Sequence, residues 1–146
     1  MSRPTDYSPE KAAEICSLLG DGQSLKEICE REDMPVRSTV YLWLSRHNEF
    51  SDMYARAREE QADTLADEII GIADEASRDT KTLTHDDGSK YEVCDHEWIN
   101  RSRLRVDARK WVAAKLKPKK YGDKVTNEHT GADGGPLVIS WQPNAG

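Results

Sequence analysis

Apolar residues recur at helical spacing near the start of the chain. After Ser8-Pro9-Glu10, which combines a capping hydroxyl, a proline and an acid, the apolar positions fall on one face of a helix. The glycines at 20 and 22 end that helix. Ser24 and Glu27 have the spacing of a capping box, which predicts a short second helix.

A third helix is predicted over residues 36–46, after a turn at 32–35 that contains a proline. Its inward-facing residues are expected to be Val36, Val40, Trp43 and Leu44. A tryptophan on the apolar face of a helix is usually part of the core. Three short helices with a tight turn before the third predict a helix-turn-helix domain over residues 1–48.

Two longer helices follow, at about 50–76 and about 100–116. The apolar stripe of the first is too narrow for that helix to fold alone. The second helix is expected to pair with it in antiparallel fashion. The residues that it offers for this pairing are Leu104, Ala108, Trp111, Val112 and Leu116. We therefore assign residues 49–117 to a central region of oligomerisation helices.

A β-hairpin is predicted between these helices, as an insertion at about 79–99. Asp87-Gly88 lies between segments rich in β-branched and aromatic residues, which is a strong hairpin signal. A register with His85 opposite Lys90 would place four side chains on one face, namely Thr82, Thr84, Tyr91 and Val93. A two-stranded hairpin alone is marginally stable in water, so it is either mobile or packed against a neighbour.

The C-terminal region, residues 118–146, reads as a glycine-rich linker followed by one strand at 136–141. A strand with no partner in its own chain suggests that copies of the chain pair their strands. The predicted fold class is therefore mainly α, with an N-terminal helix-turn-helix domain and a central antiparallel hairpin of long helices for oligomerisation. A short C-terminal β-strand would pair between subunits.

Charge is distributed unevenly along the chain. The net charge is −6, yet residues 101–124 carry ten basic and two acidic side chains, and residues 49–78 carry three basic and nine acidic ones. One interpretation is a second DNA surface, formed by Lys115, Lys117, Lys119, Lys120 and Lys124. The other, which we favour for the arginines, is ion pairing across subunits. It would join Arg103, Arg105 and Arg109 to Asp63, Asp67 and Glu68.

The outer side of the predicted third helix carries groups that can bind DNA. Side chains in the first turns of such a helix reach base edges in the major groove. The candidates there are Arg37, Ser38, Thr39 and Tyr41, and Arg46 near the end could hold a backbone phosphate. The alternative is a solvated face of a tri-helical unit that docks proteins.

Other classes of function find little support in the sequence. No apolar segment is long enough for a transmembrane helix, and the N-terminus lacks a secretory signal. Three separated cysteines fit a reducing, cytosolic compartment. Cys94 and His96 have no second ligand pair at a zinc-site spacing, so we expect no metal. No catalytic cluster is expected either, because the helical acids lack a His, Cys or Lys partner at a usable spacing. No cofactor is predicted.

Three segments resemble the terminase small subunits of tailed bacteriophages of the Shigella-phage type. They are 34–44, Arg103-Leu104-Arg105-Val106-Asp107-Ala108-Arg109-Lys110-Trp111, and Pro118-Lys119-Lys120-Tyr121-Gly122-Asp123-Lys124-Val125-Thr126. The resemblance covers most of the chain in the same order. Two features depart from the family pattern. The hairpin segment is long, and Leu42 stands where a basic residue is common, which argues against strong phosphate contacts there.

The resemblance implies a homo-oligomeric ring that is not an enzyme. The peripheral helix-turn-helix domains would recognise the packaging site on concatemeric viral DNA, and the protein would recruit and modulate the large terminase subunit. Its expected location is the host cytoplasm, with no membrane contact and no structural role in the virion. Trp111 and Val138 are further candidates for subunit contacts. The alternative function is a dimeric helix-turn-helix transcriptional regulator; a small nuclease is a distant third.

Overall fold

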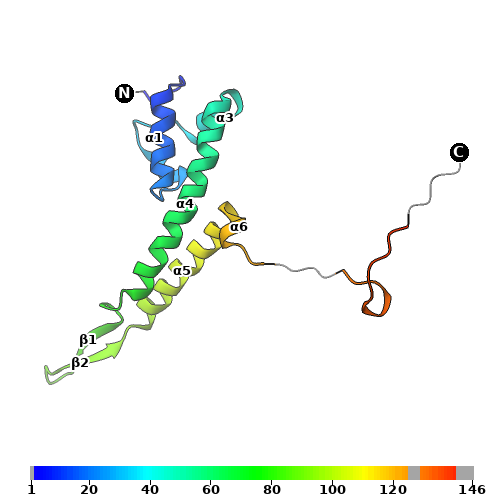
Figure 1. Cartoon of the computed structure of the whole chain (residues 1–146). Helices are drawn as coiled ribbons and strands as arrows, with labels where there is room; N and C mark the ends of the chain where they lie inside the picture. The colour runs from blue at the N-terminus through cyan, green and yellow to red at the C-terminus, as the bar shows by residue number, and fades with distance from the viewer. Residues whose placement is uncertain (1, 125–128, 141–146) are drawn as a thin grey trace, which may run out of the picture.

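The computed structural model describes residues 2–124 and 129–140 and is mainly helical. The N-terminal helices lie against one half of the long helix α4, and α5 runs back along its other half (Figure 1). The β-hairpin lies at the far end of this pair (Figure 1). The elements are α1 (Pro9–Gly20), α2 (Leu25–Glu30), α3 (Arg37–Arg46), α4 (Asn48–Asp74), β1 (Thr80–Thr84), β2 (Lys90–Cys94), α5 (His96–Leu116), α6 (Pro118–Tyr121) and η1 (Ala132–Gly134).

The N-terminal helices begin where the capping signals predict. The Ser8 side chain accepts a hydrogen bond from the backbone N–H of Lys11 at the start of α1. At α2 the capping box is complete: the Ser24 hydroxyl accepts from the Glu27 N–H, and the Glu27 carboxylate accepts from the Ser24 N–H. These bonds satisfy backbone donors that the first turn of a helix leaves unpaired. The three predicted N-terminal helices are confirmed.

The core of this N-terminal unit extends into the next helix. Buried side chains of α1, α2 and α3 form one cluster with Phe50 and Ala57 of α4. The α4 helix is therefore shared, because its first turns close the core of the N-terminal helices and its later turns pack on α5. The predicted domain boundary at residue 48 stays a prediction: it states that residues 1–48 fold independently of the rest of the chain.

The turn between α1 and α2 is held against α4 by two polar side chains. The buried Gln61 amide donates to the backbone oxygen of Gln23 at 2.9 Å, and the Thr64 hydroxyl donates to that of Gly20 at 2.6 Å. Gly22 has a φ of +101°, which only glycine adopts readily, and a Cβ there would lie 3.3 Å from Thr64. These contacts fix the N-terminal unit on α4, as buried polar groups need partners.

The antiparallel pairing of the two long helices is confirmed, but the contact face predicted for α5 is only partly right: Val112 and Leu116 are half-buried, whereas the other three predicted residues are exposed. Leu104 and Trp111 are 65% and 64% exposed, and Ala108 between them is exposed as well. The side facing α4 instead carries Val106 and Ala113. At 100° per residue these two sets lie on opposite sides of the helix. The sequence therefore contains two apolar stripes on α5, and only one can contact α4.

The hairpin forms as predicted, but its register differs by one residue. Thr84 pairs with Lys90, so that His85 lies opposite Ser89 and their backbones are joined by a hydrogen bond of 2.8 Å. The loop has three residues rather than two, with Gly88 in the left-handed region at a φ of +86°. Consequently Leu83 and Lys81, not Thr82 and Thr84, share a face with Tyr91 and Val93.

The described part of the C-terminal region, residues 118–124 and 129–140, contains no strand. Of the segment predicted to be a strand, Trp141 lies outside the described residues, and Val138 is 87% exposed. A strand requires a partner, so pairing between copies stays a prediction. The segment expected to be only a linker begins with a helical turn, α6, whose signal is Pro118 at its first position.

Candidate nucleic-acid interface

The turn before α3 sets the direction in which this helix leaves the N-terminal unit. Met34 and Pro35 are buried beneath it. The Arg31 guanidinium donates to both carboxylate oxygens of Asp33, at 3.1 and 2.9 Å. Val36, which we expected inside, is the N-cap and is 43% exposed. The prediction fails because Met34 and Pro35 already occupy the interior at this end of α3.

The inner face of α3 is anchored by aromatic contacts. Trp43 is buried, as predicted, and its indole Nε1–H donates to the backbone oxygen of Thr5 at 3.4 Å. Its ring meets Tyr7 edge-on at 5.5 Å between centroids, and His47 stacks on Tyr7 at 3.6 Å. Edge-to-face pairs of this kind contribute beyond their buried area. The inner face is thus rigidly held, which fixes what the outer face presents.

The outer face of α3 presents most of the predicted DNA-binding residues to solvent. Arg37, Ser38, Tyr41 and Arg46 are exposed, and Thr39 is half-buried. Among the described residues no ion pair involves either arginine. The structure therefore brings these groups together on one accessible surface. Leu42, which the sequence marked only as standing where a basic residue is common, is exposed on this surface one helical turn after Ser38.

The segment that precedes α1 contacts the C-terminal end of α2. The Arg3 guanidinium donates to the backbone oxygens of Cys29 and Glu30, at 2.6 and 3.4 Å. These carbonyls lie at the C-terminal end of α2, where a cation is favourable. Burial raises the pKa of the Cys29 thiol, against the opposing effect of Arg37 and Arg3. The Arg3 guanidinium is thus engaged in hydrogen bonds within the protein, whereas the Arg37 guanidinium at the start of α3 is accessible to a ligand.

The predicted second DNA surface is partly occupied by contacts inside the chain. Asp63 of α4 accepts from Lys117 Nζ at 2.8 Å, from Lys120 Nζ at 2.9 Å and from Tyr121 Oη at 2.6 Å. These partners hold the pKa of the Asp63 carboxyl far below its ordinary value. The ammonium of Lys115 lies over the Trp111 ring. Of the five predicted lysines, only Lys119 and Lys124 make no such contact among the described residues.

The arginine pairing expected across subunits also occurs within one chain. Arg109 Nε donates to Glu68 Oε2 at 2.7 Å, because the antiparallel packing of α4 and α5 brings the two side chains together. Asp63 likewise pairs within its own chain. Arg103, Arg105 and Asp67 form no ion pair among the described residues. Arg109, Glu68 and Asp63 thus have ion-pair partners in their own chain, and their pairing across subunits stays a prediction.

Asp63→Asn is expected to loosen α6 from α4. In hydrogen exchange, the amides of residues 117–121 should lose protection, while those of α1 should keep theirs. Because the folded-state pKa of Asp63 is depressed, its contribution is complete above the ordinary value of 3.8 and is lost as the pH falls below it. The difference from the unaltered protein should therefore stay constant from about pH 5 to about pH 8.

The matched control is Asp67→Asn, one helical turn along α4 at an exposed carboxylate. It should leave the exchange of residues 117–121 unchanged. Equal effects of the two substitutions would contradict the assignment, since only Asp63 contacts α6.

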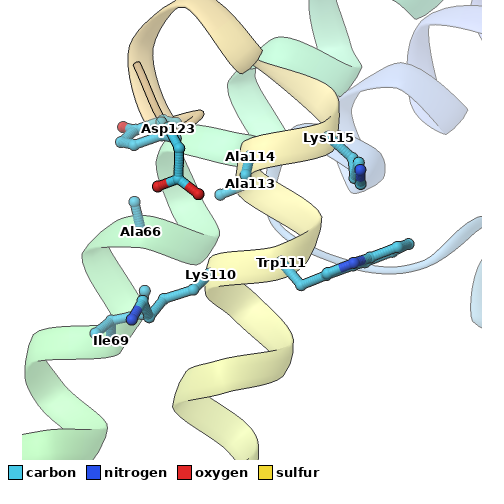
Figure 2. A pocket seen from close by; sticks show the side chains of 9 residues that line it. Ala66, Ile69, Lys110, Trp111, Ala113, Ala114, Lys115 and Asp123 are labelled. Carbon is cyan, nitrogen blue, oxygen red and sulfur yellow. The ribbon is translucent and has the colours of Figure 1, made fainter. Parts of the chain in front are cut away.

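A surface hollow of about 500 Å³ lies beside the C-terminal part of α5. Its walls come from Ala66 and Ile69 of α4 and from Trp111 and Lys115 of α5. Figure 2 shows the Trp111 side chain pointing away from α4, and this side chain is 64% exposed. The pair of α4 and α5 thus exposes apolar side chains around Trp111, and this surface is separate from the outer face of α3.

Together these features define the class of protein: a helix-turn-helix unit carried on a long helical hairpin. The particular family follows from a family model. The chain belongs to the family described as Bacteriophage Sf6, terminase small subunit-like, whose model matches residues 7–128. Membership of this family supports a role in phage DNA packaging.

Solved structures give the same result. Three crystal structures of the terminase small subunit gp1 of the bacterial virus Sf6, each with a different single substitution, are similar to this chain. Each is 46% identical in sequence, with a TM-score of 0.67, and the match covers 96% of this chain and 95% of the other. No curated protein matches the chain. The family resemblance seen in the sequence and the predicted fold class are confirmed.

Over residues 2–124 and 129–140, no three His, Cys, Asp or Glu side chains are grouped so that they could hold a metal ion. In the same part of the chain, none of the helices has the length and apolar character required to cross a membrane.

Proposed function

We propose that this protein is the DNA-recognition adaptor of a phage packaging machine. In this role it binds the packaging site on concatemeric viral DNA through α3 and recruits the large terminase subunit. It modulates the ATPase and nuclease of that subunit and carries out no catalysis itself. It acts in the host cytoplasm as a homo-oligomeric ring. Family membership and the fold support this proposal.

The observation that carries the proposal is the outer face of α3. A rigid helix with an exposed guanidinium at its first position and hydroxyls beside it is suited to the major groove. The inner face is fixed by Trp43 and Tyr7, so this surface is held in one orientation. Preorganisation of this kind reduces the entropy lost on binding.

Few cations lie on this face, so a single copy should bind DNA weakly. Arg37 and Arg46 are the basic residues of α3. Several copies held together raise the effective concentration of the remaining copies once one is bound. The ring is thus part of how the protein binds DNA, and the exposed apolar stripe on α5 is a suitable surface for forming it.

The decisive test combines the shape of the oligomer with its binding to DNA and its effect on the large subunit. Electron microscopy of the purified protein should show rings, and the protein should bind its own genome's packaging region and alter the ATPase rate of the large subunit. A two-fold dimer that binds a palindromic operator without any effect on the ATPase would instead support a transcriptional regulator. Metal-dependent DNA cleavage by the protein alone would indicate a nuclease.

Arg37→Ala should weaken DNA binding by about 1–3 kcal/mol if the guanidinium pairs with a guanine. The loss should persist at moderate salt, because a base contact depends less on counterion release than a phosphate contact does. Fluorescence anisotropy with a labelled duplex measures it. Arg101→Ala, at an exposed arginine near the hairpin end of α5, is the matched control and should bind normally. Unchanged affinity of Arg37→Ala would remove Arg37 from the interface.

A further inference from the structure

The centre of the exposed face of α3 is apolar. Ser38, Leu42 and Ser45 are spaced four and three residues apart and therefore form one ridge of the helix. This ridge lies opposite Val40 and Trp43, which point into the core. Leu42 is 44% exposed in the middle of the ridge. An aliphatic side chain is thus accessible to solvent in the middle of the outer face of α3.

The neighbours of Leu42 leave little hydrogen-bonding capacity on this ridge. The Ser45 hydroxyl donates to the backbone oxygen of Leu42 at 2.7 Å, so its proton is directed back to the helix. Ser38 retains a hydroxyl toward the N-terminal end. Tyr41 is exposed beside this ridge and adds further apolar surface, and Val36 is exposed at the N-cap of the helix. The centre of this ridge therefore presents carbon atoms, and the charged groups Arg37 and Arg46 are exposed elsewhere on the helix.

We propose that Leu42 is a specificity-determining residue that reads the 5-methyl group of thymine in the major groove. This inference rests on the proposed function, because it requires α3 to enter that groove. Thymine is the unmodified base that offers a methyl group there, and apolar side chains recognise it by contact. The preferred site therefore contains thymine opposite Leu42, next to the base pair that Arg37 contacts.

The structure favours DNA over another protein subunit as the partner of Leu42. The α3 helix lies toward the end of the molecule opposite the hairpin, whereas the exposed stripe with Trp111 lies along α5 (Figure 1). Arg37, Ser38 and Arg46 surround the leucine with cationic and hydroxyl groups that suit phosphates and base edges. A subunit contact would leave these polar groups to be buried against protein.

The test uses the tightest-binding duplex selected from a random-sequence library of double-stranded DNA by the full-length protein. This duplex is then synthesised in two forms, with thymine and with deoxyuridine, which differ only in the methyl groups. The unaltered protein should bind the uracil form about fourfold more weakly for each methyl group that it contacts. Leu42→Ala should bind both forms equally and as weakly as the unaltered protein binds the uracil form.

Two further variants keep the result interpretable. Leu42→Met retains a flexible apolar side chain and should keep part of the preference for thymine. Leu83→Ala removes a leucine of similar exposure, 39%, from the hairpin and should keep the full preference. Discrimination that persists in Leu42→Ala would come from DNA shape rather than from Leu42, and it would overturn the proposal.

The remaining outcomes separate this inference from the proposed function. Equal binding of both forms by the unaltered protein would overturn the reading of thymine while leaving DNA recognition intact. A fall in the oligomer mass of Leu42→Ala, measured by light scattering, would identify Leu42 as a subunit contact instead. Failure to select any duplex would refute both the proposed function and this inference.

Discussion

Phe50→Ala is expected to destabilise the N-terminal unit by about 3–5 kcal/mol and to abolish DNA binding. Phe50 is fully buried at the start of α4. Its ring contacts those of Tyr7, Trp43 and Tyr54, with centroids 6.0 to 6.4 Å apart. Removing the ring leaves a cavity in the core that α1, α2 and α3 share with α4. A loss of this size is a large part of the stability of a small domain.

The same substitution tests whether the molecule has two separable units. Hydrogen exchange should show that α1, α2 and α3 lose protection, while the pairing of α4 with α5 persists. Leu83→Ala, at an exposed residue, should change neither region. Loss of protection along the whole of α4 and α5 would contradict the predicted boundary near residue 48 and would make the chain one cooperative unit.

Local signals determined the N-terminal helices almost completely. A capping hydroxyl at Ser8, the box of Ser24 with Glu27 and the glycine at 22 act within a few residues of where they stand, so sequence reasoning can find them. The same applies to Trp43, whose place on the apolar face of α3 predicted its burial.

Contacts between distant segments could not be predicted in the same way. Asp63 and Lys117 are 54 residues apart, and charge counts alone do not say whether opposite charges pair within a chain or between chains. The prediction of the hairpin register was wrong for a related reason. Asp87-Gly88 suits both a two-residue and a three-residue loop, and one residue of difference changes which side chains share a face.

In the candidate interface, some features could be predicted from the sequence and others could not. The polar residues of α3 lie on the outer face, as their spacing predicted. From the sequence, Leu42 was interpreted only as a missing phosphate contact, whereas major-groove recognition also uses apolar contact. The exposure of an aliphatic residue at the centre of a polar surface is a property of the folded helix, which periodicity alone does not distinguish from a half-buried position.

The two apolar stripes of α5 lead to the second large expected effect. One stripe contacts α4, and the other, with Leu104 and Trp111, is about two-thirds exposed. Ile70 on α4 is similarly exposed. Exposed large apolar side chains that share one helix face, as Leu104 and Trp111 do, usually mark a contact with another protein molecule, and tryptophan is prominent among residues that dominate such contacts.

Trp111→Glu is therefore expected to convert the oligomer to monomers. Light scattering should give several times 16.5 kDa for the unaltered protein and about 16.5 kDa for the variant. A buried tryptophan at a contact contributes about 2 kcal/mol or more, and a carboxylate in its place adds a desolvation cost at every interface of a ring. Tyr41→Glu changes an exposed aromatic residue on α3 and should keep the full mass. If Trp111→Glu keeps it too, the ring must be held by other surfaces, of which the exposed segment around Val138 is the next candidate.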